Sequence, residues 1–166
     1  MDDAEFREFI GTRLDQVRRT AYLMCGDWHA ADDAVSTAVL HVYQNWRRVS
    51  RMQNVDAYLR RSVINAWLDE RRRPWRRERS VAELPARAGA DAVAPVDDRL
   101  AVLQHLDQLP ARRRAVIVLR FYCDLSVDET AQVMECTPGT VKSQTARALD
   151  TLRASMVDVT DLASKE

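Results

Sequence analysis

Hydrophobic residues recur at helical spacing over most of this chain. Apolar positions three and four residues apart predict a first helix that ends near Gly26 and a second from Ala31 to Trp46. A third helix is predicted to begin after Asn54, whose side chain can cap it, and to end before Pro74. No segment alternates with period two for long enough to indicate a strand. The pattern therefore predicts an all-α fold.

The helical pattern is lost between Trp75 and Val96, where alanine, proline, glycine and acidic residues dominate. Such a composition is typical of a flexible linker. Helical periodicity resumes over residues 97–108 and 110–122. We therefore predict two small helical domains at 1–74 and 97–156, joined by a flexible linker at 75–96 and followed by a tail at 157–166.

Residues 126–156 carry the signals of a helix-turn-helix. Ser126 and Glu129 have the spacing of a capping box, in which each side chain satisfies the other residue's backbone amide. A short turn follows, and Thr137 can cap the next helix. Pro138 then occupies the first helical position, where no amide donor is needed.

This second helix has two distinct faces. One is an apolar stripe formed by Val141, Thr145, Ala148, Leu149, Leu152 and Met156. The opposite face carries Thr140, Lys142, Ser143, Gln144 and Arg147. Short polar and basic groups on one side of a helix suit the DNA major groove. Helical hairpins with a merely solvated basic face are also common, so the spacing alone leaves both interpretations open.

Acidic and basic residues are segregated along the chain, although its net charge is zero. Residues 1–46 hold eight acids and four arginines, whereas residues 47–79 hold eleven arginines and four acids. The basic block suits a phosphate backbone, and the acidic block suits a basic protein surface or solvent.

Several classes of function fit this sequence poorly. No apolar run has the length of a membrane span, and the acidic start is not that of a signal peptide, so we expect a cytoplasmic protein without membrane insertion. Cys25 and His29 lie one helical turn apart, but two ligands do not make a metal site. With no glycine-rich phosphate loop and no catalytic triad, we expect no enzymatic activity, no metal and no cofactor.

The order of these features resembles the extracytoplasmic-function (ECF, group IV) sigma factors of bacterial RNA polymerase. Residues 21–43, AYLMCGDWHAADDAVSTAVLHVY, are similar to the family's regions 2.1 and 2.2. Residues 54–73, NVDAYLRRSVINAWLDERRR, are similar to regions 2.3 and 2.4. Residues 106–149, from LDQLPARRR to GTVKSQTARAL, are similar to region 4. The resemblance thus covers both predicted domains, which it identifies as sigma-2-like and sigma-4-like.

The resemblance assigns Asp32 and Asp33 to the helix that docks on the clamp helices of the polymerase's largest subunit. Both are expected on an exposed face, where carboxylates can pair with arginines of a coiled coil. The alternative is a solvated first turn that complements the helix dipole. Ser36 stands where many family members have glutamine.

Asn65 falls where the family holds a flipped base of the −10 promoter element. An amide can both donate and accept, as reading a base edge requires. The alternative role is that of a polar residue that caps or bridges helices. Trp67 is expected in the core, and Trp75 against either DNA or the polymerase. The resemblance assigns phosphate contacts in the opening duplex to Arg60, Arg61, Arg71, Arg72 and Arg73.

In the second domain, the family's −35-reading positions correspond to Thr140, Lys142, Ser143, Gln144 and Arg147. Gln144 stands where arginine is frequent, and Ala146 where bulkier residues occur, so a different DNA sequence should be read. Before the helix-turn-helix, contacts with phosphate or the polymerase are open to Arg112, Arg113 and Arg114.

The resemblance implies a sigma factor that directs the polymerase core to specific promoters and promotes melting of the −10 element. Its partners would be the core enzyme, through the clamp helices and the flap, and promoter DNA. Many relatives are also held inactive by an anti-sigma factor. Outside these complexes a monomer is expected. The residues leave open two other classes, a free-standing helix-turn-helix regulator and a protein-interaction module, although a repressor usually needs a dimer interface and none is evident.

Overall fold

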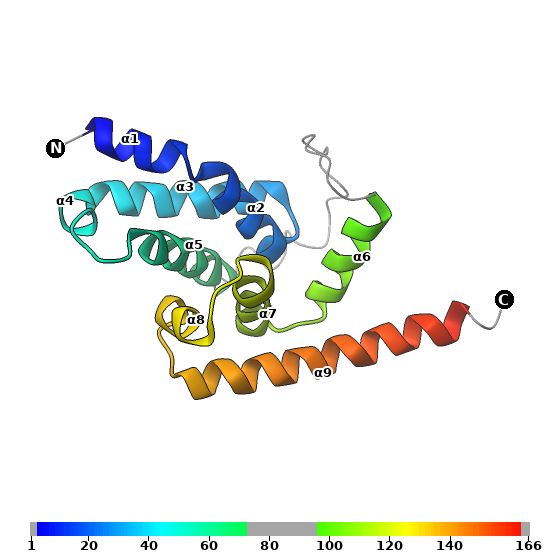
Figure 1. Ribbon diagram of the computed structural model, residues 1–166. Coiled ribbons are helices and arrows are strands. Elements are labelled where there is room, and N and C mark those ends of the chain that lie inside the picture. The colour runs from blue at the N-terminus through cyan, green and yellow to red at the C-terminus, as the bar shows by residue number, and fades with distance from the viewer. Residues whose placement is uncertain (1–2, 73–95, 164–166) are drawn as a thin grey trace. The chain divides into compact units, whose positions relative to one another are not determined.

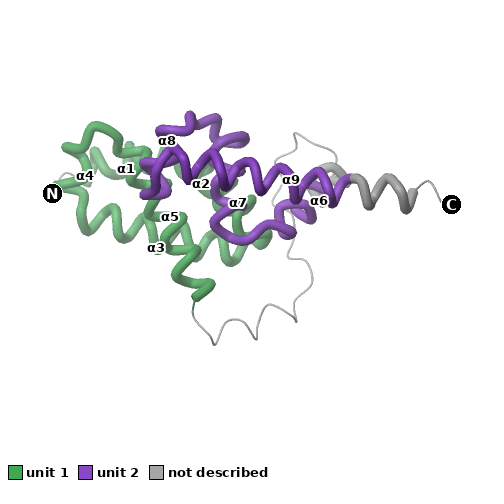
Figure 2. Tube along the Cα trace, turned by 90° about the horizontal axis from the view of Figure 1, so that it is seen from below, with its two compact units in different colours: residues 1–87 green, residues 88–166 purple. Residues whose placement is uncertain are grey.

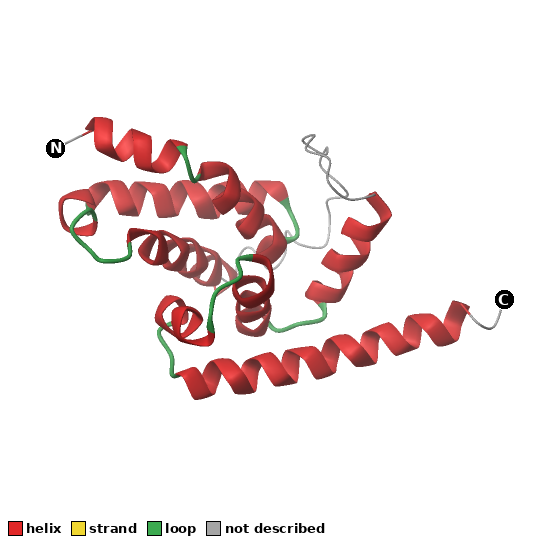
Figure 3. Cartoon of the chain, viewed as in Figure 1, coloured by secondary structure: helices red, strands yellow, loops and turns green. Residues whose placement is uncertain are grey.

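The computed structural model describes the backbone of residues 3–72 and 96–163, and the side chains of residues 3–72 and 101–156. Every regular element in this described part is a helix, as Figure 3 shows, so the predicted all-α fold is confirmed. The chain divides into two compact units, residues 1–87 and 88–166, which Figure 2 colours separately. Of the predicted linker, residues 75–95 lie outside the described residues, as do Arg73 and Trp75.

The first unit contains the helices labelled α1 to α5 in Figure 1. Their bounds are α1 Asp3–Gly11, α2 Leu14–Cys25, α3 Trp28–Gln44, α4 Trp46–Val49 and α5 Val55–Arg72. Asn54 caps α5 as predicted, because its Oδ1 accepts from the amide of Ala57 at 2.8 Å.

The prediction of one continuous first helix was wrong, because α1 and α2 are separate. The Thr12 hydroxyl donates to the carbonyls of Glu8 and Phe9 at the end of α1, at 3.2 and 3.1 Å. Side chains of this kind compete with the backbone ladder and favour helix ends. Arg13 then forms an ion pair with Asp56 of α5, which fixes the break.

The core of the first unit lies where α3 packs against α2 and α5. Alanines on α2 and α3 allow the helix backbones to approach closely, and aliphatic residues fill the remaining space. Trp46 is 4% exposed, and its ring contacts Phe6 and Phe9 with centroids 5.3 and 5.1 Å away. The core residues are Phe6, Val17, Ala21, Ala31, Val35, Ala38, Val42, Trp46, Val49, Leu59 and Val63.

The second unit contains α6 Val96–Asp107, α7 Ala111–Ile117, a π-helical segment η3 Val118–Tyr122, α8 Val127–Met134 and α9 Pro138–Ala163. The helix predicted over residues 110–122 therefore changes type after Ile117. The widened turn is closed by a bond of 3.0 Å from the Cys123 amide to the Val118 carbonyl.

Both predicted caps of the helix-turn-helix are confirmed. The Glu129 amide donates to Ser126 Oγ at 3.1 Å, and the Ser126 amide donates to Glu129 Oε2 at 2.7 Å. Thr137 Oγ1 accepts from the amide of Thr140 at 3.1 Å, and Pro138 opens α9. The turn between α8 and α9 passes through Glu135 in the left-handed region, with φ of 51°.

Helix α9 packs against α7 and α8 through Val141 and Ala148, which are both fully buried. The predicted apolar stripe does not reach Met156, whose side chain is 58% exposed. At that end of the stripe α6 meets α9 through Ser155, whose Oγ lies 3.0 Å from His105 Nδ1. Helix α9 continues to Ala163, beyond the end at residue 156 that the sequence indicated.

We expect Ser126→Ala to lower the free energy of unfolding of the helix-turn-helix by about 1 kcal/mol, because it removes an N-cap acceptor. Native-state hydrogen exchange of the α8 amides in the full chain would measure this change. Ser126→Thr keeps the accepting oxygen, so its free energy of unfolding should fall much less. Equal losses in the two variants would contradict the capping role.

Candidate functional site

Three of the five polar residues predicted for α9 lie together on its outer face. Because a helix turns by 100° per residue, Thr140, Ser143 and Arg147 project away from the buried Val141 and Ala148. All three are exposed. The Ser143 hydroxyl donates to the Thr140 carbonyl at 3.0 Å, while Arg147 forms no ion pair with any residue that the structure describes.

The other two lie on the margins of this face. Lys142 is exposed on one flank, and Gln144 is half-buried on the other. The Gln144 side chain contacts α7, where Arg113 Nε donates to its Oε1 at 3.2 Å. The sequence analysis did not predict this bond, because thirty-one residues separate its partners.

The three arginines that precede the helix-turn-helix have different surroundings. Arg112 is exposed and donates to the Met134 carbonyl at 3.4 Å. Arg114 is only 4% exposed and pairs with Asp107, with Nη1 and Oδ1 2.8 Å apart. The suggestion that Arg114 contacts phosphate or the polymerase was therefore wrong, because this side chain belongs to the interior of the unit.

Helix α5 divides its predicted DNA-binding residues between two faces. Asn65, Arg61 and Arg72 share one face, since four and seven residues separate them in turn. Arg60 and Arg71 share another face, about a third of a turn away. The Arg71 guanidinium lies over the ring of Trp67, 5.7 Å from its centroid.

Trp67 is 3% exposed, which confirms its predicted place in the core. The Asn65 side chain, in contrast, is exposed and forms no hydrogen bond with the part of the chain that the structure describes. The alternative role of capping or bridging helices therefore has no support among these residues. Arg73, the sixth residue predicted for this surface, lies outside the described residues.

Asp32 and Asp33 differ more than the sequence suggested. Arg18 of α2 binds Asp32 in a bidentate manner, with Nε to Oδ1 at 2.7 Å and Nη2 to Oδ2 at 3.0 Å. The hydrogen bond from Arg18 lowers the pKa of the Asp32 carboxyl, against the opposing effect of partial burial. Asp33 is exposed, whereas Asp32 is half-buried. Both carboxylates are accessible, as expected, but the Asp32 side chain is 47% exposed and paired with Arg18.

Arg18 is also held by an aromatic pair. Its guanidinium lies 5.5 Å from the centroid of the Trp28 ring, and that ring stacks on Tyr22 with centroids 4.1 Å apart. Arg18 and Tyr22 lie four residues apart on α2, and Trp28 and Asp32 lie four residues apart on α3. The two pairs meet across the α2–α3 turn. That repeated spacing is the sequence signal that would have identified the cluster.

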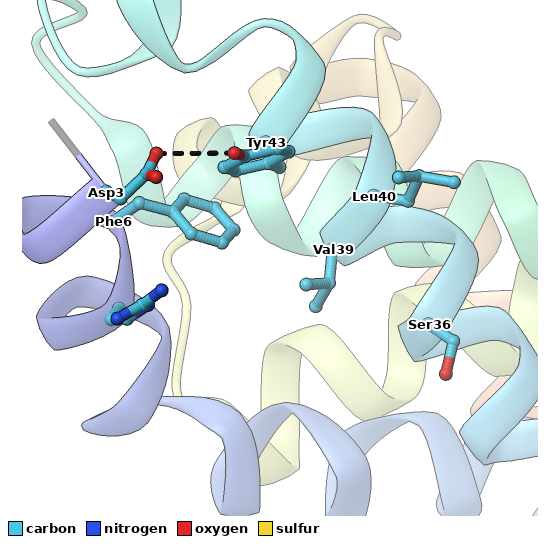
Figure 4. A pocket seen from close by; sticks show the side chains of 7 residues that line it. Asp3, Phe6, Ser36, Val39, Leu40 and Tyr43 are labelled. Atoms are coloured by element: carbon cyan, nitrogen blue, oxygen red, sulfur yellow. Dashed lines mark hydrogen bonds between the residues drawn. The ribbon is translucent and has the colours of Figure 1, made fainter. Parts of the chain in front are cut away.

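A groove of about 480 Å³ lies between α1 and α3. Figure 4 shows its lining, with Tyr43 Oη donating to Asp3 Oδ1 at 3.3 Å. Leu40 is 56% exposed there, on the same face of α3 as Asp33. Leu40 and the groove beside it together form an accessible, partly apolar surface that the sequence analysis did not predict. The groove is lined by Asp3, Phe6, Arg7, Ser36, Val39, Leu40 and Tyr43.

Metal-binding and membrane-spanning features were also sought in the described residues. No three histidine, cysteine, aspartate or glutamate side chains gather there in a way that would hold a metal ion. None of the helices within residues 3–72 and 96–163 has both the length and the apolar character needed to cross a membrane.

Family models match both helical units. The model of Sigma-70 region 2 matches residues 9–77, and that of Sigma-70 region 4 matches residues 99–152. The RNA polymerase sigma-E factor of Streptomyces coelicolor is 35% identical over 158 residues, which are 92% of this chain and 86% of the relative. The ECF RNA polymerase sigma factor SigM of Mycobacterium tuberculosis is 33% identical, with 89% of this chain and 74% of the relative covered.

Solved structures share the fold. The sigma factor RpoE from Bartonella quintana, in complex with the anti-sigma factor NepR, has a TM-score of 0.75 at 21% identity, with 90% of this chain and 95% of that chain covered. CnrH, in complex with the cytosolic domain of CnrY, has a TM-score of 0.68 at 19% identity, with 95% and 90% covered.

These matches include both halves of the chain, in the order that the sequence indicated. A free-standing helix-turn-helix regulator would account for the second half alone, so that alternative is not favoured. Sigma factors are regulatory, non-enzymatic subunits, and this one recruits the polymerase core to particular promoters. The chain therefore belongs to the ECF family of RNA polymerase sigma factors.

Proposed function

We propose that this sigma factor divides its work among three surfaces, on α9, α5 and α3. Helix α9 reads the −35 element, α5 holds the melted −10 element, and α3 docks on the polymerase core. The observation that carries the proposal is the outer face of α9, where Thr140, Ser143 and Arg147 stand exposed opposite the buried Val141 and Ala148. These three side chains are the centre of the −35 surface, with Lys142 and Gln144 at its margins.

On α5, Asn65 holds a flipped base through its amide. Support comes from its exposure and from the absence of a partner for that amide among the described residues. The arginines on the same helix neutralise phosphates around the flipped base. Arg61 and Arg72 lie beside Asn65, while Arg60 and Arg71 follow a second face, so the strand crosses the helix instead of following one line. Arg73 extends this basic surface in the sequence.

On α3, Asp33 is the main docking carboxylate for arginines of the polymerase clamp helices. Asp32 is already neutralised by Arg18, so its role is mainly to fix the start of α3. The neighbouring groove supplies an apolar contact through Leu40. Charged residues beside an exposed apolar residue are typical of a specific protein interface.

Further partners and conditions follow from the family. The domain at 97–156 meets the polymerase flap, and the domain at 1–74 meets the clamp helices. Two relatives of the same fold are in complexes with NepR and with the cytosolic domain of CnrY, which supports an anti-sigma factor as a further partner. The chain acts in the cytoplasm, is monomeric outside these complexes, and catalyses no reaction.

We expect Asp33→Lys to weaken binding to core polymerase by about thirtyfold or more, since lost interfacial charge pairs cost about 2–5 kcal/mol. Competition binding with a labelled sigma factor would measure the affinity, and circular dichroism would check the fold. Glu8→Lys makes the same charge change at an exposed site of α1 outside the groove lining, and should have little effect. Equal effects of the two variants would rule out a specific role for Asp33.

Arg147→Ala should weaken binding of the holoenzyme to a duplex promoter by about 1–3 kcal/mol, the usual worth of a good base contact. A gel shift at fixed salt would measure it. Arg153→Ala removes the same charge from α9, but Arg153 is already paired with Asp150, so this variant should have a smaller effect. If Arg153→Ala weakened binding as much, the contribution of Arg147 would be one of charge alone.

Asn65→Ala should leave closed-complex binding intact but reduce strand opening, because the extruded base loses the group that holds it. Permanganate reactivity of thymines near the start site would report opening. On a template whose −10 region is already melted, the variant should lose less open complex than on the duplex promoter. Equal losses of binding and opening on both templates would make Asn65 a residue of the fold.

A further inference from the structure

We propose that Arg113 of α7 selects the base that Gln144 reads, by holding the oxygen of the Gln144 amide toward α7. The inference rests on the proposed role of α9 in reading the −35 element. Arg113 would then be a specificity-determining residue that acts through Gln144 and that need not contact a base itself.

The contact between the two side chains fixes the orientation of the amide. Arg113 Nε lies 3.2 Å from Gln144 Oε1, and both residues are half-buried at the junction of α7 and α9. A guanidinium has donors only, whereas an amide has an oxygen with two accepting lone pairs and a nitrogen with two donating hydrogens. The glutamine must therefore turn its oxygen toward Arg113, and its NH₂ group is left for a ligand.

This orientation changes which base edge suits Gln144. A glutamine with both groups available binds adenine in a bidentate manner, because adenine presents N7 as an acceptor and N6 as a donor. When the oxygen faces Arg113, one of its two lone pairs is used and the other lies beside a cation, so it is a poor acceptor for the adenine N6 amino group. Guanine instead offers two acceptors, N7 and O6, and thymine offers O4. Gln144 in this chain should therefore favour guanine, accept thymine, and disfavour adenine and cytosine.

The neighbouring arginine provides a matched control. Arg112 lies on the same helix and carries the same charge, but it donates to the Met134 carbonyl and not to Gln144. Loss of Arg112 should therefore change the affinity for DNA without changing the preferred base. A holding contact also reduces the number of Gln144 rotamers before binding, which lowers the entropic cost of the base contact.

The test uses holoenzyme reconstituted with core polymerase and a library of duplex promoters with a randomised −35 element. Bound duplexes are recovered and sequenced for the parent chain and for Arg113→Met, which keeps the apolar stem without the donors. We expect one position that favours guanine over adenine in the parent. Arg113→Met should shift that ratio toward adenine by at least about fivefold, the lower end of the worth of one bidentate base contact.

Further variants trace the effect to the pair. Gln144→Ala should remove the preference at that position, and Arg113→Met should change nothing more when Gln144 is already alanine. Arg113→Lys retains a donor and should keep part of the guanine preference, while Arg112→Met should leave the ratio unchanged. Thermal unfolding of each variant would confirm that it is folded.

Three results would overturn the inference. A uniform loss of affinity in Arg113→Met, without a change in base ratio, would make Arg113 a phosphate contact. An equal shift in the Gln144→Ala background would mean that Arg113 acts without Gln144. A Gln144→Ala library identical to that of the parent would show that Gln144 reads no base. The Arg147→Ala library separates these results from a failure of the proposed function. If α9 does not read the −35 element, the Arg147→Ala library will also match that of the parent. If only the inference about Arg113 fails, the Arg147→Ala library will differ from that of the parent.

Discussion

The burial of Val141 and Ala148 between α9 and its neighbours fixes the rotation of that helix about its axis. Because side chains follow a helix at 100° per residue, this constraint decides which of its residues face outward. This constraint places Thr140, Ser143 and Arg147 at the centre of the outer face and turns Gln144 toward α7. The capping of α8 and α9 by Ser126 and Thr137 fixes where each helix begins, so the two constraints together define the recognition surface.

Internal ion pairs decide which charges are left for partners. Arg13, in the turn between α1 and α2, pairs with Asp56 of α5, and the pairs Arg18–Asp32 and Arg114–Asp107 each join two helices. Exposed pairs of this kind add little stability, but Arg114 is buried, and removal of Asp107 would weaken the compensation of a buried charge. The blocks of charge along the sequence therefore overestimate the number of charged side chains that the folded surface offers to partners. Asp33 and Arg147 matter because both side chains are exposed to a partner.

Local signals in the sequence predicted the parts of the fold that depend on local chemistry. The capping box at Ser126, the start of α9 at Thr137 and Pro138, and the burial of Trp67 were all predictable from residues within one or two helical turns. The break between α1 and α2 and the π-helical turn at Val118–Tyr122 were not, since both run against a continuous apolar pattern. The pairs Arg18–Asp32 and Arg113–Gln144 depend on which helices become neighbours, which periodicity does not state. Leu40 could have been identified as an apolar residue off the buried stripe.

The central claim is that promoter specificity belongs to the complex of this chain with core polymerase and not to the chain alone. The most direct test measures the affinity of the free chain and of the reconstituted holoenzyme for a cognate promoter and for a scrambled duplex, at one salt concentration. We predict that the free chain binds both duplexes with similar affinity, of roughly micromolar strength or weaker, because phosphate contacts dominate. The holoenzyme should prefer the promoter strongly. Tight and sequence-specific binding by the free chain, unchanged on addition of core, would contradict this account.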